Sequence, residues 1–109
     1  LAGDALTDAD FNVAVGYAAL SSDTLGSKSV AIGQGALNEQ NFTTATDAHN
    51  TAVGHAAGNR ISTGVRNTIV GGLAADAVTT GQYNSVLGFG CKPNNSSDFF
   101  QCRYWKKRR

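Results

Sequence analysis

The feature that most constrains the fold of this chain is a five-residue phrase that returns along its length. The phrase begins with Asn, or once with Ser, continues through small and β-branched residues, and ends with Gly. Its five copies occupy residues 12–16, 29–33, 50–54, 67–71 and 84–88. The closing glycines are 17, 21, 17 and 17 residues apart, and they are Gly16, Gly33, Gly54, Gly71 and Gly88. A phrase that recurs at a nearly fixed interval is typical of a solenoid, in which each copy builds one coil.

Each copy of the phrase has the alternation of a short β-strand. Val13 and Val15 share one face, and Ala14 takes the opposite face. β-Branched residues dominate the phrase, which favours a strand over a helix. A second turn signal follows within the unit, as at 24–26. The sequence therefore predicts an all-β fold, a parallel β-roll or β-solenoid of about six short coils, with strands about 4.8 Å apart.

The recurring residues of the phrase are interpreted as structural. Glycine enters positive-φ conformations cheaply and lets another backbone approach closely, so the phrase Gly is expected at a corner of each coil. The Asn at the head of the phrase is expected to stack in a column whose amides hydrogen-bond along the axis. Its members are Asn12, Asn50, Asn67 and Asn84, with Ser29 in the remaining coil.

The 109 residues form at most one ordinary domain. The pattern predicts a repeat domain over residues 1–91, interrupted by an insertion at 38–49, and a separate aromatic and basic segment at 92–109. The insertion is polar and has no period, so it is expected to bulge as a loop, either as a plain surface loop or as a contact surface. Its candidate contact residues are Asn41, Phe42 and His49.

The end of the chain differs in chemistry from the repeat. Its basic and aromatic residues suit a cap on the open end of the roll or a contact between subunits. They also suit binding to the phosphates of nucleic acid or to an anionic membrane surface, and a short solvated end is a further alternative. The candidate assembly residues are Tyr104, Trp105, Lys106, Lys107, Arg108 and Arg109. A net charge of +1 predicts no general attraction to nucleic acid, and no nucleic-acid partner is expected. Cys91 and Cys102 leave both a disulfide and two free thiols open.

No motif in the sequence predicts a catalytic site, a metal or a cofactor. His49 and His55 have no cysteine or carboxylate at ligand spacing. Residues 33–35 lack the third glycine and the helix of a dinucleotide fingerprint, and no P-loop sequence occurs. The serines have no nucleophile-elbow context, and the carboxylates are scattered. We therefore expect a protein that is not an enzyme.

Two copies of the phrase carry a resemblance to known families. Ser29-Val30-Ala31-Ile32-Gly33 resembles the head repeat of YadA-type trimeric autotransporter adhesins, and residues 50–57 resemble the related repeats of bacteriophage tail fibres. The resemblance covers about residues 1–91, and the 17-residue period favours the phage variant over the shorter YadA-type unit. It implies a left-handed parallel β-roll that assembles as a homotrimer and carries attachment to a surface. The matching positions are structural, so the resemblance implies no receptor-binding residue.

The phrase also argues for a trimer independently of the resemblance. A narrow coil buries little apolar area, and at about 25 cal/mol per Å² this hardly offsets an ordering cost of about 1–2 kcal/mol per residue. Residues such as Val15, Ile32 and Leu87 add more apolar surface than a narrow roll can hide. We therefore expect one face to pack on partner chains.

The function predicted from these observations is a structural segment of an extracellular attachment fibre, on a virion tail or a cell surface. Its expected partners are copies of itself and a host cell-surface glycan or protein. The alternatives are a bacterial trimeric autotransporter adhesin head and a self-assembling extracellular filament subunit. Binding of a regular lattice through threonines has less support, because only Thr51 and Thr68 are in register within the phrase.

Overall fold

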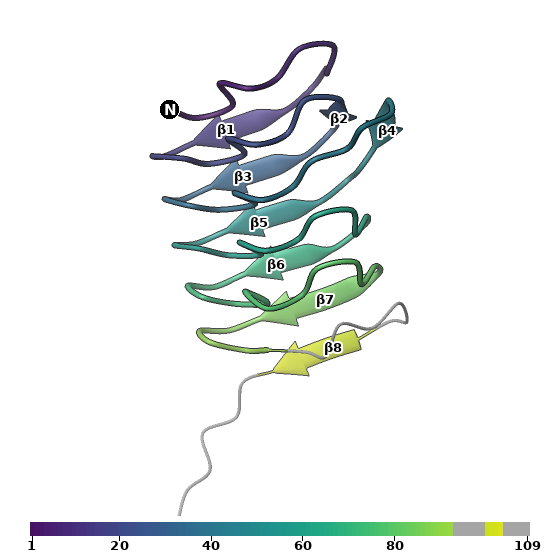
Figure 1. Cartoon of the computed structure of the whole chain (residues 1–109). Helices are drawn as coiled ribbons and strands as arrows, with labels where there is room; N and C mark the ends of the chain where they lie inside the picture. Colours follow the sequence, from purple (N-terminus) through teal and green to yellow (C-terminus); the bar gives the residue numbers. More distant parts are fainter. Residues whose placement is uncertain (93–99, 104–109) are drawn as a thin grey trace, which may run out of the picture.

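The computed structural model describes residues 1–92 and 100–103, and every regular element in these residues is a β-strand (Figure 1). The strands are short because the chain turns after every phrase. They are β1 (Val13–Val15), β2 (Gly26–Ser27), β3 (Val30–Ile32), β4 (Thr46–Asp47), β5 (Thr51–Val53), β6 (Thr68–Val70), β7 (Asn84–Leu87) and β8 (Phe100–Arg103).

Five of these strands are the copies of the phrase, and they stack in sequence order. Strands β1, β3, β5, β6, β7 and β8 form one parallel sheet in that order, and β2 pairs with β4 in a second one. The register places each phrase on the next, as in Ala14 against Ala31 and Ala31 against Ala52. Four complete turns lie between Gly16 and Gly88, and Figure 1 shows them stacked along one axis. The predicted all-β parallel solenoid is thus confirmed.

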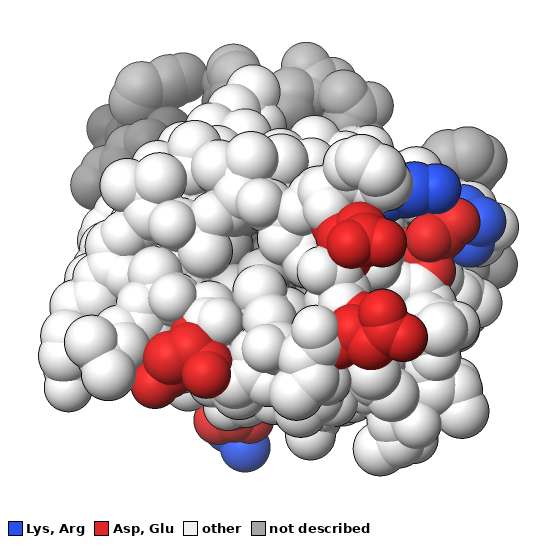
Figure 2. Space-filling view, turned by 90° about the horizontal axis from the view of Figure 1, so that it is seen from above, with Lys and Arg blue, Asp and Glu red and all other residues white. Residues whose placement is uncertain are grey.

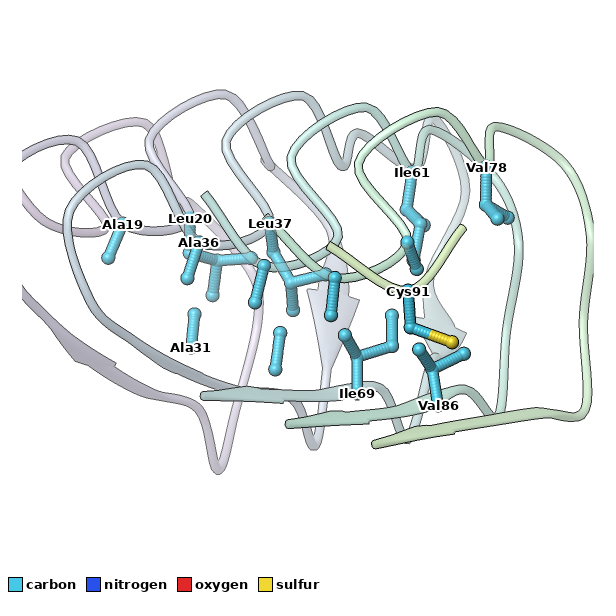
Figure 3. Close-up of a cluster of buried hydrophobic side chains, with 14 residues drawn as sticks. Ala19, Leu20, Ala31, Ala36, Leu37, Ile61, Ile69, Val78, Val86 and Cys91 are labelled. Atoms are coloured by element: carbon cyan, nitrogen blue, oxygen red, sulfur yellow. The ribbon is translucent and has the colours of Figure 1, made fainter. Parts of the chain in front are cut away.

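The interior of the coils is narrow and filled by small residues. The middle residue of each phrase points inward, as at Ala31, Ile69 and Val86, and all three are buried. Figure 3 shows these side chains pointing toward residues of the opposite wall such as Leu20 and Leu37. Because alanine occupies so many inward positions, the two walls approach closely and the core is a thin layer along the axis.

The phrase glycine is required where one coil touches the next. Gly54 has a φ of +136°, and a Cβ at this position would lie 2.6 Å from both the carbonyl carbon and the oxygen of Gly71. Gly33 stands in the same relation to Gly54, with a φ of +129°. The expectation of a positive-φ corner with close backbone approach therefore holds at these positions.

The insertion at 38–49 is not the plain bulge that its lack of period predicts. Thr46–Asp47 forms β4 and continues the second sheet beside β2. Phe42 is only 5% exposed, and its ring packs against Gly26, where a Cβ would come within 2.7 Å of the ring. The backbone N–H of Phe42 also donates to Asp23 Oδ1 over 3.0 Å. Phe42, predicted as a contact residue, is therefore buried against the preceding coil, because the corner at Gly26 leaves room for its ring.

The parallel sheet continues beyond residue 91, the predicted end of the repeat domain. Strand β8 pairs with β7 in register, with Asn84 opposite Phe100 and Leu87 opposite Arg103. Cys91 is disulfide-bonded, and Cys102 is the other cysteine of the chain. The repeat character of the sequence ends before the sheet does, since β8 carries no copy of the phrase.

Candidate functional site

The Asn residues of the phrase form a buried column in which each amide links two coils. Asn50 Nδ2 donates to the carbonyl of Gly64, and Asn67 Nδ2 donates to the carbonyl of Gly81, over 2.8 and 3.0 Å. Asn50 Oδ1 in turn accepts the backbone N–H of Asn67 over 2.9 Å, and Asn67 Oδ1 accepts that of Asn84 over 3.0 Å. The amides of Asn50 and Asn67 make all their hydrogen bonds inside the fold, so this part of the column holds the coils together and leaves no group for a ligand.

The column is broken at Ser29, and the insertion fills the gap. Gln40 is fully buried, and its Nε2 donates to Asp23 Oδ2 over 2.6 Å and to Ser29 Oγ over 3.2 Å. Its Oε1 accepts a hydrogen bond from Asn50 Nδ2 over 2.7 Å. The amide that Ser29 lacks is thus supplied from another part of the same coil. Sequence reasoning missed this role, because Gln40 lies in a segment without period.

The remaining candidates of the insertion lie apart from each other. Asn41 and His49 are both exposed, and the Oδ1 of Asn41 accepts a hydrogen bond from Thr24 Oγ1 over 3.3 Å. His49 lies immediately before the phrase at the start of β5, and His55 lies beyond the end of that strand. The two histidines therefore stand at opposite ends of one strand and do not form a pair.

The residue before each Asn or Ser of the phrase builds an exposed ridge along the axis. All five residues are exposed, and all five have a positive φ between 53° and 65°. They precede β1, β3, β5, β6 and β7, which are consecutive in the sheet. We call this row the exposed ridge, and its members are Phe11, Lys28, His49, Arg66 and Tyr83.

The centre of the exposed ridge is cationic. Lys28 Nζ lies 2.9 Å from Asp47 Oδ2, and this hydrogen bond lowers the pKa of Asp47. Desolvation opposes the shift, while the charge of Lys28 and, after it, those of His49 and Arg66 reinforce it. The Arg66 guanidinium lies over the Tyr83 ring, 5.8 Å from its centroid. Seen from the N-terminal end, Lys and Arg side chains appear mainly on one side of the coil, beside acidic ones (Figure 2).

Sequence reasoning missed the exposed ridge because its members share no chemical type. The only signal was positional, since a large side chain stands before the phrase in every copy. Only the backbone shows that these positions share one left-handed conformation and one surface.

The outward side of the main sheet carries a second exposed row, at the carboxyl end of the strands. Large exposed apolar side chains stand there in the coils of β1, β3, β6 and β7, and Leu87 is 61% exposed and Phe89 66% exposed. We call this row the apolar edge, and its members are Val15, Tyr17, Ile32, Val70, Leu87 and Phe89. The exposed ridge and the apolar edge lie at opposite ends of the same strands.

Residues 1–92 and 100–103 contain no group of three or more His, Cys, Asp or Glu side chains placed to hold a metal ion. No helix in them has the length and apolarity needed to cross a bilayer. The candidate assembly residues, Tyr104, Trp105, Lys106, Lys107, Arg108 and Arg109, lie outside the described residues.

Comparison of the chain with models of known protein families, with curated proteins and with solved structures found no match. We therefore infer the function from the geometry of the solenoid and its two exposed rows.

Proposed function

We propose that the chain is a non-catalytic structural segment of an extracellular attachment fibre, of the kind found on phage tails, and that it assembles as a homotrimer. The observation that supports this most directly is the apolar edge. It follows the axis along β1, β3, β6 and β7, with half-buried Val53 in the coil of β5 between them, and it stands on one parallel sheet. An apolar row on a regular scaffold is the feature expected of a surface that packs against identical copies.

The size of the apolar edge suits such packing. Full burial of a large apolar side chain is worth about 1.5–3 kcal/mol, so covering a half-exposed one gives about 1 kcal/mol. Six such side chains therefore offer about 6 kcal/mol per chain, before the cost of association is subtracted. Each chain of a trimer meets two neighbours, which raises the gain for the complete assembly.

The proposal also includes the finer features that the resemblance implies, a left-handed roll of about six coils and a host-surface glycan or protein as receptor. A solenoid suits this role, because each coil contacts only its neighbours and the fold projects without a globular core. A bacterial adhesin head would use the same roll, and it differs only in being joined to a membrane anchor.

The test of the assembly is light scattering on the purified chain and on variants of the apolar edge. Leu87→Asp places a charge in the row, and Thr68→Asp is the matched control, because Thr68 is exposed on the same sheet outside the apolar edge. We expect the wild type and Thr68→Asp to be trimers and Leu87→Asp to dissociate. A wild-type chain that is a well-folded monomer at micromolar concentration would refute the trimer.

A self-assembling filament is the second candidate, and the open edges of the main sheet favour it. Among residues 1–92 and 100–103, β1 pairs on one side, with β3, and β8 pairs on one side, with β7. Unpaired edges of this kind accept further strands unless they are covered. Electron micrographs of the same samples separate the two candidates, since closed trimers have a fixed length and end-to-end stacking gives filaments of variable length.

A further inference from the structure

The exposed ridge is strained, and no burial compensates for the strain. A left-handed backbone is unfavourable for every residue with a Cβ, and Gly, Asn and Asp tolerate it best. None of the five ridge residues is Gly, Asn or Asp, although all five have a φ near +60°. Phe11, at 79% exposure, shows how little of the row is buried.

Some other positive-φ positions differ from the ridge in being buried. Leu20 and Leu37 also have positive φ, but both are fully buried and fill the core. At the ridge the side chains reach solvent and make surface contacts, such as the ion pair of Lys28 with Asp47, while the backbone N–H groups of Lys28, Arg66 and Tyr83 donate to carbonyls of the preceding coil. Surface contacts of this kind contribute little to stability. Strained residues that packing does not require are characteristic of functional sites.

The chemistry of the ridge indicates the class of ligand. Lys28, His49 and Arg66 are exposed just before β3, β5 and β6, which are neighbours in the sheet, so the centre of the row presents two cations and an imidazole, with Asp47 paired to Lys28. Aromatic rings flank this centre at both ends, at Phe11 and Tyr83. Cations with flanking aromatic rings suit an extended chain that carries negative groups and apolar ring faces.

We propose that the exposed ridge binds an extended acidic polysaccharide along the solenoid axis. Lys28, His49 and Arg66 pair with its carboxylate or sulfate groups, and the two aromatic rings pack on the faces of its sugars. Successive ridge residues are about 4.8 Å apart, the separation of paired strands, which is close to the length of one pyranose unit in an extended chain. Successive phosphates of a stretched single strand of nucleic acid are farther apart, so the spacing favours the polysaccharide.

The inference rests on the proposed attachment function in naming the ligand class, but it does not depend on the trimer. All five residues belong to one chain, and the ridge lies at the end of the strands opposite to the apolar edge. One chain therefore has separate surfaces for assembly and for ligand binding.

The experiment measures binding of the full chain to immobilised heparin, which is sulfated, and to alginate, which carries carboxylates, with neutral dextran as the blank. The ridge variant is Lys28→Gln with Arg66→Gln. The matched control is Arg60→Gln with Lys92→Gln, which removes the same charge from exposed residues elsewhere. We expect binding of wild type to at least one acidic polymer, weakening with added salt. The ridge variant should bind about tenfold or more weakly, since charge-assisted contacts are lost, and the control should bind as wild type does.

Two further variants exclude a loss caused by unfolding. Arg66→Gly relieves the left-handed strain, so its thermal midpoint should not fall while its binding does. Tyr83→Ala should weaken binding without changing the charge of the chain. Circular dichroism of each variant reports the fold.

Three results would overturn the inference. They are the absence of binding to both acidic polymers, an equal loss in the ridge variant and its control, and binding of single-stranded DNA in place of polysaccharide. Light scattering on the same samples keeps this test apart from the proposed assembly. A monomer with ridge-dependent binding would refute the trimer alone, and a trimer without polymer binding would refute the ridge site alone.

Discussion

Replacement of Gln40 tests whether the insertion completes the Asn column. Gln40→Ala removes the partner of Asp23 Oδ2, and a hydrogen bond to a buried charged group contributes about 1.5–3 kcal/mol. It also removes the acceptor of one Asn50 hydrogen bond, which contributes about 1 kcal/mol, and it leaves a small cavity. We expect a loss of about 3–5 kcal/mol in the free energy of unfolding.

A substitution at Ser29 tests the same role of Gln40 from the other side of the contact. Ser29→Asn restores the residue found in the other copies of the phrase, but the buried Gln40 side chain already occupies the space beside Ser29. The single variant should therefore be overpacked and lose about 1–3 kcal/mol. In Ser29→Asn with Gln40→Ala, the new amide enters the space that the glutamine leaves. The combined loss should be smaller than the sum of the two by about 1 kcal/mol or more.

The assay is urea unfolding followed by circular dichroism at one fixed protein concentration, since any assembly makes stability depend on concentration. Asn41→Ala is the control, because Asn41 is the exposed neighbour of Gln40, and its loss should stay within about 0.5 kcal/mol. Additive losses in the double variant, or a loss for Gln40→Ala no larger than that of the control, would refute the role assigned to Gln40.

Two other predictions concern the corners and the exposed ridge. Gly54→Ala should destabilise the chain by about 3 kcal/mol or more, because the new Cβ would meet the Gly71 carbonyl in the next coil, and urea unfolding measures this. Gly35→Ala, also at positive φ but with its nearest neighbour 3.4 Å away, should cost only about 1 kcal/mol, and equal losses would contradict the steric argument. Lys28→Gln should raise the pKa of Asp47 toward its ordinary value, as followed by NMR titration, and an unchanged pKa would show that the ion pair is not formed in solution. Because its pKa is lowered, Asp47 stabilises the fold at pH values above its unfolded pKa of about 3.9. This stabilisation is lost as the pH falls through the folded pKa. Lys28→Gln should therefore reduce the dependence of stability on pH in that window.

The period and the alternation of the phrase predicted most of the scaffold. They placed Ala14 on the inner face, Val15 on the outer face and the phrase glycine at a corner, because these depend only on strand geometry and on the stacking of equal units. The excess of apolar residues also indicated an uncovered surface before the apolar edge was located. These features were predictable because each copy of the phrase repeats the same local information.

The features that sequence reasoning missed depend on neighbours in space. Gln40 and Phe42 belong to a stretch without period, and their burial follows from a gap at Ser29 and from the open space above Gly26 in the preceding coil. The exposed ridge escaped notice for another reason. Side chains as different as Lys28 and Tyr83 share only a backbone conformation, which amino-acid type does not reveal at non-glycine positions.

The register of one phrase upon the next has a consequence for how such a chain can change in length. Each copy of the phrase contributes one strand and follows one residue of the exposed ridge. Every copy except that of Ser29 adds an Asn to the column, and every coil except that of β5 adds to the apolar edge. Duplication of a single 17-residue segment would thus extend the scaffold, its internal hydrogen bonds and both surfaces together. The added coil would pack on its neighbours through the same contacts as the existing coils. The length of the solenoid and the number of residues on its surfaces would therefore increase together with each added coil.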